Sequence, residues 1–100
     1  MRVMKQENVS KEDYAGKLFT GPNVTRQPMA PDSQDYNVNI INFGKGVRNK
    51  LHIHESDQIL IVTAGAGIVA TENEEIKVET GDVILIPAGE KHWHGAGPES

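Results

Sequence analysis

Short segments rich in β-branched and aliphatic residues follow one another from Tyr36 to the end of this 100-residue chain, separated by turns that contain glycine, proline or acidic residues. None of these segments has the apolar period of a helix, so the pattern predicts strands. The predicted strands are residues 36–43, 51–54, 58–63, 68–71, 76–79, 83–86 and a last one beginning at His92, with residues 65–67 as a turn. This spacing is typical of an antiparallel sandwich or small barrel, and it makes the chain all-β.

Two of the predicted strands, residues 59–62 and 83–86, are apolar at every position. A sheet with water on one face alternates apolar and polar residues, so these two segments need cover on both faces. A second sheet or a partner chain has to supply that cover.

The chain has the size of one domain. Residues 1–35 are polar and weakly patterned, and we expect them to form an N-terminal arm with short strands at residues 18–20 and 24–26. The arm belongs to the same domain as the barrel core, residues 36–100. It either wraps the barrel or pairs with a second subunit.

The composition excludes several classes of function. No cysteine is present, so disulfides and thiolate ligands are ruled out and a bound metal must use nitrogen and oxygen donors. The net charge of −4 comes without a basic run, which argues against nucleic acid as a partner. No apolar run reaches the roughly 18 residues that span a bilayer, and the N-terminus lacks the apolar core of a signal peptide. We therefore expect a cytoplasmic protein with no membrane partner.

The four histidines of the chain form two tight pairs, His52 with His54 and His92 with His94. Each pair has one residue between its members, and in a strand such residues point to the same face. A single histidine is more often a surface residue or a satisfied core residue. Two pairs with the same spacing favour a metal site instead, because a neutral imidazole is a common metal ligand.

Two spaced motifs contain these histidines. The first is Gly46-x5-His52-x-His54-x3-Gln58-x6-Gly65, and the second is Gly81-x5-Pro87-x-Gly89-x2-His92. With the segment between them they span about half of the chain, and they resemble the two motifs of the cupin family. The resemblance implies a double-stranded β-helix, a jelly-roll-like antiparallel barrel, with a metal ion inside it.

The same resemblance implies the ligands of that ion. Matched position by position, it assigns His52, His54 and His92 as metal ligands. Gln58 stands where most cupins have glutamate, and its amide oxygen can serve as the fourth ligand. The neighbouring carboxylates, Glu55 and Asp57, point away from the histidine face if the strand alternates. We expect one divalent transition metal: manganese or iron first, with nickel or zinc possible for the same donors.

A narrower resemblance is to small single-domain cupins that include hydroxynitrile lyases of the mandelonitrile-lyase type. Those cupins also have glutamine in the first motif, and the run Gly-Glu-Lys-His-Trp-His-Gly-Ala at residues 89–96 is similar to their second motif. Where the lyases tend to have threonine three positions before the first ligand, this chain has Asn49.

His94 is the candidate catalytic acid or base. Gln58 cannot accept a proton as a glutamate would, and His94 lies two residues beyond ligand His92 on the same predicted face. Its ordinary pKa suits proton transfer near neutral pH. The alternative is that His94 only fills the mouth of the barrel and bonds to a backbone carbonyl, and the sequence leaves both interpretations open.

These expectations favour a metal-dependent enzyme acting on a small organic substrate, with lyase chemistry as the most concrete version. The metal would act as a Lewis acid and His94 as the acid or base. A metal-dependent dioxygenase and a non-catalytic cupin that binds a ligand as a sensor are the alternatives. A homodimer is expected, as in the family.

Overall fold

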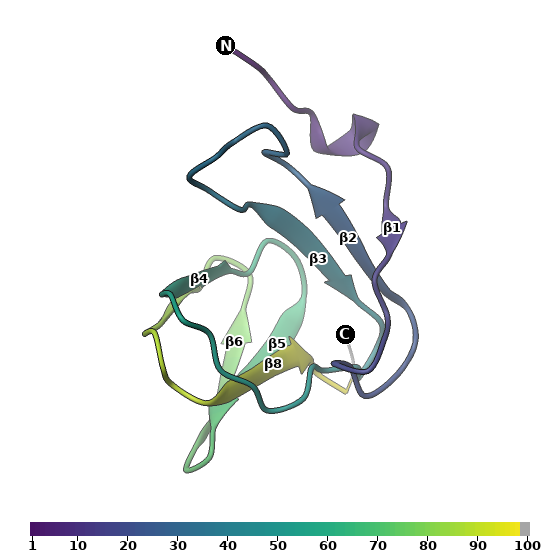
Figure 1. The fold of residues 1–100 in the computed structure, drawn as a ribbon. Coiled ribbons are helices and arrows are strands. Elements are labelled where there is room, and N and C mark those ends of the chain that lie inside the picture. The colour runs from purple at the N-terminus through teal and green to yellow at the C-terminus, as the bar shows by residue number, and fades with distance from the viewer. Residues whose placement is uncertain (99–100) are drawn as a thin grey trace.

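The computed structural model describes residues 1–98, and these residues form antiparallel strands with one short helical turn (Figure 1). The elements in chain order are η1 (Gln6–Asn8), β1 (Glu12–Asp13), β2 (Val24–Pro28), β3 (Asn39–Phe43), β4 (Gln58–Ile61), β5 (Ala66–Thr71), β6 (Glu75–Glu79), β7 (Val83–Ile86) and β8 (His92–Ala96). The all-β prediction is confirmed.

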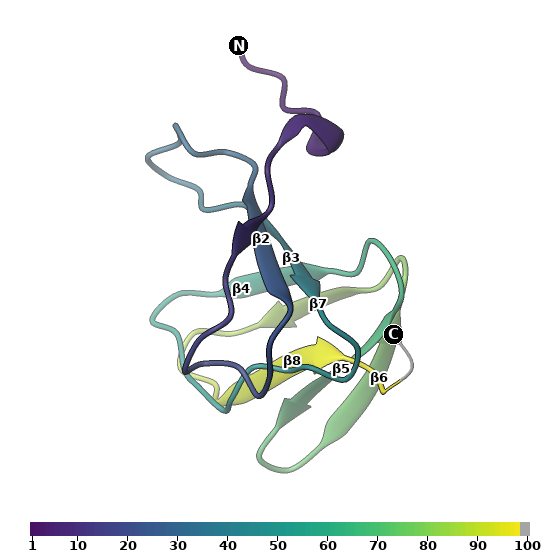
Figure 2. The same cartoon turned by 90° about the vertical axis from the view of Figure 1, so that its right-hand side faces the viewer.

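The strands pair in three antiparallel sheets. The first has the order β1-β2-β3, the second consists of β4 and β7, and the third has the order β6-β5-β8. Figure 2 shows β8, β5 and β6 lying below the strands of the other two sheets. Because β4 and β8 belong to different sheets, residues of the two sequence motifs can face each other across the space between them.

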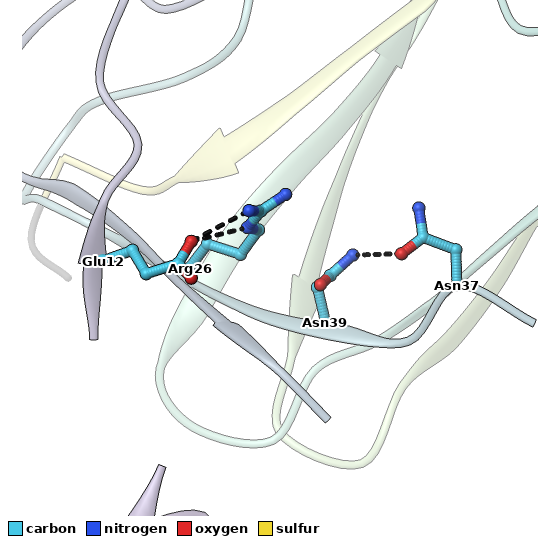
Figure 3. A network of polar contacts seen from close by, with 4 residues as sticks. All are labelled: Glu12, Arg26, Asn37 and Asn39. Carbon is cyan, nitrogen blue, oxygen red and sulfur yellow. Dashed lines mark hydrogen bonds and ion pairs between the residues drawn. The ribbon is translucent and has the colours of Figure 1, made fainter. Parts of the chain in front are cut away.

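The N-terminal sheet attaches the arm to the rest of the molecule. Arg26 of β2 donates to the carboxylate of Glu12 in β1 through Nη2 at 2.8 Å and Nε at 3.2 Å (Figure 3). The buried side chain of Gln27 donates to the carbonyl oxygens of Gln6 and Val9, which holds η1 against β2. Since β2 pairs with β3, this sheet spans the predicted boundary at residue 36.

A small apolar core lies beside this sheet. Its buried residues are Phe19, Val24 and Val47, and Ile41 and Phe43 of β3 pack against them. The rings of Phe19 and Phe43 meet edge to face with centroids 5.9 Å apart, a favourable geometry for aromatic pairs. The core therefore connects the N-terminal sheet to the segment that precedes His52.

Three local predictions differ from the structure. Residues 18–20 and 51–54 are not regular strands: Phe19 forms only an isolated bridge with Asn49, and His52 only one with His92. Residues 65–67 are not simply a turn, because β5 begins at Ala66. Gly67 lies inside that strand. A Cβ added at Gly67 would be 2.5 Å from the carbonyl oxygen of Gly95 on β8, so only glycine allows the two strands to approach this closely.

The two apolar strands β4 and β7 are covered on one face only. Ile86 is buried on the inner face, whereas the outward side chains of both strands are exposed. The described part of this chain thus covers the inner face of these two strands, which is one of the two faces that were predicted to need cover. Within that part, no helix has the length and apolar character needed to cross a membrane.

Candidate metal centre

Three of the four histidines converge on one point. A ligand atom from each of His52, His54 and His92 can be chosen so that all three atoms lie within 4.8 Å of one another. The rings of His52 and His92 have centroids 4.4 Å apart, and those of His52 and His54 are 4.8 Å apart. His52 reaches this position because its backbone exchanges two hydrogen bonds of 2.9 Å with that of His92. The two sequence motifs therefore meet at this bridge.

Backbone carbonyls determine the tautomers of two of these rings. Nδ1 of His52 lies 2.6 Å from the carbonyl oxygen of Lys50, and Nδ1 of His92 lies 2.9 Å from that of Glu90. A carbonyl oxygen can only accept, so each Nδ1 carries a proton and donates it. In the neutral rings Nε2 is then left with a lone pair, and a metal-binding histidine is commonly oriented in this way.

Each of these Nε2 atoms has another nitrogen or oxygen atom close to it. Nε2 of His92 lies 3.1 Å from Oε1 of Gln58, and Nε2 of His52 lies 3.1 Å from Nε2 of His54. Between neutral His92 and Gln58 there is no proton to share, so two acceptors confront each other. Such a contact is unfavourable unless a cation lies between the two atoms. The donor chemistry of this cluster therefore fits a positive ion.

The spacing of the donor atoms also fits a metal. Ligand atoms about 2.1 Å from an ion and at right angles to each other are roughly 3 Å apart. The two contacts of 3.1 Å agree with this separation. Asp57 does not take part, because its carboxylate accepts from the backbone N–H of Ala88 at 2.9 Å. The acidic neighbour that is closest to Gln58 in sequence is thus used to hold a turn.

The cluster is buried at one end and open at the other. His92 is only 2% exposed, whereas His54 is the most accessible of the three histidines. Partial burial, followed by the nearby rings of His52 and His92, lowers the pKa of His54. A lowered pKa keeps the ring neutral at physiological pH, which is the state that binds a metal.

His94 lies beside the cluster rather than in it. Its ring is stacked parallel to that of His92 with centroids 6.0 Å apart, and Phe43 meets it edge to face at 5.8 Å. Burial is the main cause that lowers the pKa of His94 to about 4, and the rings of His92, His52 and His54 add to it. The ring is therefore neutral at pH 7.

The buried side chain of Asn49 orients His94. Its Oδ1 accepts the backbone N–H of His94 at 2.8 Å, and its Nδ2 lies 3.1 Å from Nε2 of the His94 ring. Since the amide nitrogen donates, Nε2 of His94 accepts and the ring proton is on Nδ1. Among the described residues, the partner of the ring nitrogen Nε2 of His94 is thus a side-chain amide.

Sequence reasoning noted Asn49 only as a departure from the lyase pattern and missed its contact with His94. The contact exists because the segment before His52 lies directly on β8. An added Cβ at Gly95 would be 2.4 Å from Cα of Arg48, so only glycine allows this approach. The Gly95 that follows His94 was the one available signal, and its meaning depends on a tertiary contact.

Comparisons with known proteins agree with this geometry. Residues 39–99 match the family model described as Cupin domain. A curated relative, (R)-mandelonitrile lyase of Granulicella tundricola, is 44% identical over 59 residues, which are 58% of this chain and 45% of that protein. Acireductone dioxygenase of a Picosynechococcus species is 30% identical over 73 residues, covering 59% of this chain and 42% of that protein. The chain thus spans somewhat less than half the length of these curated relatives.

A solved structure shows the same fold. The crystal structure of a cupin-like protein from Thermotoga maritima superposes with a TM-score of 0.79 at 33% identity, covering 87% of this chain and 68% of that one. The family match includes both histidine pairs and Gln58, and the resemblance that the motifs predicted is confirmed. This chain belongs to the cupin family.

Proposed function

We propose that this chain is a divalent-metal-dependent cupin enzyme that acts on a small organic substrate by lyase chemistry of the hydroxynitrile type. The observation that carries the proposal is the convergence of three histidines with Gln58, in which the lone pair of His92 Nε2 faces Gln58 Oε1 without a proton between them. The similarity to a protein named (R)-mandelonitrile lyase supports a cyanohydrin as the substrate.

In this proposal His52, His54, Gln58 and His92 hold the ion, which is manganese or iron. A divalent ion held only by neutral side chains keeps its full charge and acts as a Lewis acid that lowers the pKa of a substrate hydroxyl. The backbone carbonyls of Lys50 and Glu90 keep the rings of His52 and His92 turned toward it. Gln58 contributes an oxygen but cannot accept a proton.

His94 moves the proton in this proposal. Cleavage of a cyanohydrin breaks the bond between the hydroxyl carbon and the nitrile carbon, and cyanide leaves with the electron pair while the hydroxyl loses its proton. Neutral His94 accepts that proton at Nε2, displacing the amide of Asn49, and then gives it to the cyanide. Because the pKa of His94 is lowered to about 4, the ring is a weak base but its protonated form is a strong acid toward cyanide.

Metal analysis combined with a mandelonitrile cleavage assay tests the proposal. The protein purified with manganese or iron should contain about one ion per chain and release benzaldehyde and hydrogen cyanide. His52→Ala should lose both the metal and the activity. His94→Gln should keep the metal and lose activity by roughly 100-fold.

Glu55→Gln is the matched control, since this exposed carboxylate adjoins His54 but is not assigned to the metal. It should keep both metal and activity. A protein without stoichiometric metal under these conditions contradicts the whole proposal. A metal-loaded protein that cleaves no cyanohydrin contradicts only the lyase part.

A dioxygenase is the second candidate, because another relative is named acireductone dioxygenase. Iron-loaded protein mixed with an acireductone should then consume oxygen, measured with an oxygen electrode, and His52→Ala should abolish the uptake. Oxygen uptake without cyanohydrin cleavage would favour this candidate over the lyase.

A further inference from the structure

A hollow lies between the segment that precedes His52 and the turn that joins β5 to β6. Its volume is about 660 Å³, which is within the range of pockets that hold small molecules. One wall contains Arg48, Lys50, Leu51 and Trp93, and the other is formed by residues 71–75. The described residues that line this hollow include none of the proposed metal ligands.

Strand alternation places the hollow on the reverse side of the wall that holds the metal centre. Trp93 lies between the two histidines of β8, so its side chain points to the opposite face of the strand. Arg48 and Lys50 flank Asn49 in the same way, and Asn49 is buried and contacts His94. The hollow is therefore separate from the metal centre, although both are built on the same two segments.

The first wall is suited to a carboxylate. The guanidinium carbon of Arg48 lies 4.1 Å from the centre of the Trp93 ring, which is a cation–π contact. A guanidinium that lies over a ring uses its face, so its in-plane N–H donors remain free for the two oxygens of a carboxylate. Within residues 1–98 neither Arg48 nor Lys50 forms an ion pair, whereas Arg2 and Arg26 each pair with a carboxylate. We call Arg48 and Lys50 the cationic wall.

The opposite wall is acidic. Glu72, Glu74 and Glu75 line it, and we call these three residues the acidic wall. Lys91 lies 4.0 Å from Glu72, while Glu74 and Glu75 form no ion pair within the part of the chain that the structure describes. Carboxylate oxygens only accept hydrogen bonds, and an ammonium group only donates them. The acidic wall therefore suits an ammonium group.

The sheet register gives the distance between the two walls. Ala70 of β5 pairs with Trp93 on β8 and with Glu75 on β6, so these three residues form one row on one face of the sheet. Neighbouring strands are about 4.8 Å apart, which places the backbone of Glu75 roughly 10 Å from that of Trp93. The opposite charges are thus held apart, and one small molecule can contact both walls.

We propose that this hollow binds a small zwitterion, a molecule of the size of an amino acid or a dipeptide with one carboxylate and one ammonium group. The carboxylate lies on the cationic wall and the ammonium group on the acidic wall. An apolar side chain of the ligand packs on Leu51, which is 45% exposed. A simple anion is repelled by the acidic wall and a simple cation by the cationic wall, so a ligand with both charges is the best complement.

Tryptophan fluorescence of the metal-free protein tests the proposal, because Trp93 is the single tryptophan of the chain. Phenylalanine or glycyl-phenylalanine should produce a saturable change with a dissociation constant in the millimolar range. N-acetylphenylalanine lacks the ammonium group and phenethylamine lacks the carboxylate, so each should bind about tenfold more weakly or less. The tighter of the two zwitterions shows whether the site takes an amino acid or a dipeptide.

Substitutions in the two walls assign the binding to the hollow. Arg48→Met and Glu75→Gln should each weaken the binding of phenylalanine by about tenfold, because each removes one charged partner. Lys11→Met removes an exposed cation of the N-terminal arm and is the matched control, which should bind as the wild-type protein does. Because Arg48→Met also changes the surroundings of Trp93, the rise of the thermal midpoint on adding phenylalanine is measured beside the fluorescence.

Four results would overturn the proposal. One is the absence of any saturable change in fluorescence or thermal midpoint at tens of millimolar of either zwitterion. Another is equal affinity for phenylalanine and N-acetylphenylalanine, which would indicate a plain anion site. The third is competition with manganese, which would place the ligand at the metal centre. The last is a folded Arg48→Met protein that binds phenylalanine as tightly as the wild-type protein. A failure of the lyase assay leaves these measurements unaffected, since they use no metal.

Discussion

The two halves of the histidine cluster are held in different ways. His92 belongs to β8, which pairs with β5 along five residues, and it is almost completely buried. His52 and His54 lie outside any named strand, on a segment that touches β8 through isolated bridges at Arg48 and His52. One half is part of a sheet. The other half lies on residues 47–54, which pack on that sheet and which we call the docked segment. The centre therefore depends on how closely the docked segment follows β8.

Separating the two halves should have the largest effect. In Gly95→Val the added Cβ would lie 2.4 Å from Cα of Arg48 and 2.5 Å from the carbonyl oxygen of Val47, so the docked segment must move away. We expect a loss of about 3 kcal/mol or more in the free energy of unfolding, measured by urea denaturation, because backbone atoms cannot yield as side chains do.

Gly16→Ala is the control for that substitution, since no other atom lies within 4 Å of the added Cβ. It should leave stability within about 0.5 kcal/mol of the wild-type value. A Gly95→Val protein as stable as this control would show that the docked segment does not need its close approach to β8.

Acid should lower the free energy of unfolding mainly through His94, which lies on β8 with His92. In the metal-free protein the pKa of His94 is lowered from 6.5 to about 4, mainly by burial. Between these two values the unfolded chain binds a proton that the folded chain does not, so stability is highest above pH 6.5 and falls toward pH 4. The expected loss is about 3 kcal/mol, measured by urea denaturation across this range.

Substitutions assign that loss to His94 on β8 or to the segment that contains His54. His94→Gln cannot titrate and should flatten most of the dependence between pH 6.5 and pH 4. His54→Gln on the docked segment should flatten it much less, because His54 is more open to water. Equal slopes in the wild-type protein and in His94→Gln would contradict the assignment.

Truncating one histidine in each half distinguishes their structural roles. His92→Ala should destabilise the metal-free protein by about 2 kcal/mol, since it leaves a cavity and an unpaired carbonyl at Glu90. His54→Ala should change the free energy of unfolding by less than about 0.5 kcal/mol. In our proposal both variants lose stoichiometric metal, so metal analysis reports the shared role while urea denaturation reports the difference.

The two halves also differ in how far sequence could predict them. The resemblance of the two motifs to the cupin family predicted that His52, His54 and His92 lie together, and the structure brings these three rings together. The strand predicted at residues 51–54 is reduced to a bridge, since only His52 exchanges backbone hydrogen bonds with β8. The strand propensity of residues 51–54 cannot reveal this, because the packing of one segment on another decides which backbone groups pair.

The apolar strands illustrate the same limit. Their sequence predicted that both faces need cover, and the structure supplies it to the inner face, where Ile86 is buried. A sequence pattern states that a surface is apolar but not which surface meets it. The contact between Asn49 and His94 was equally out of reach, since it joins residues 45 positions apart through the close approach at Gly95.

A loss of stability smaller than that of Gly95→Val is expected at the side chain that links the two halves. Asn49→Ala removes the acceptor of the His94 backbone N–H and the donor to its ring, at 2.8 Å and 3.1 Å. We expect a loss of about 1 to 2 kcal/mol in the free energy of unfolding, because the partner groups are left without hydrogen bonds. Asn73→Ala, in an exposed turn, is the control and should be close to neutral. Metal content should persist in both variants, because Asn49 orients His94 and not the three converging rings. A loss of metal in Asn49→Ala alone would mean that this one side chain holds the docked segment on β8, and that the two halves are less independent than their backbone pairing indicates.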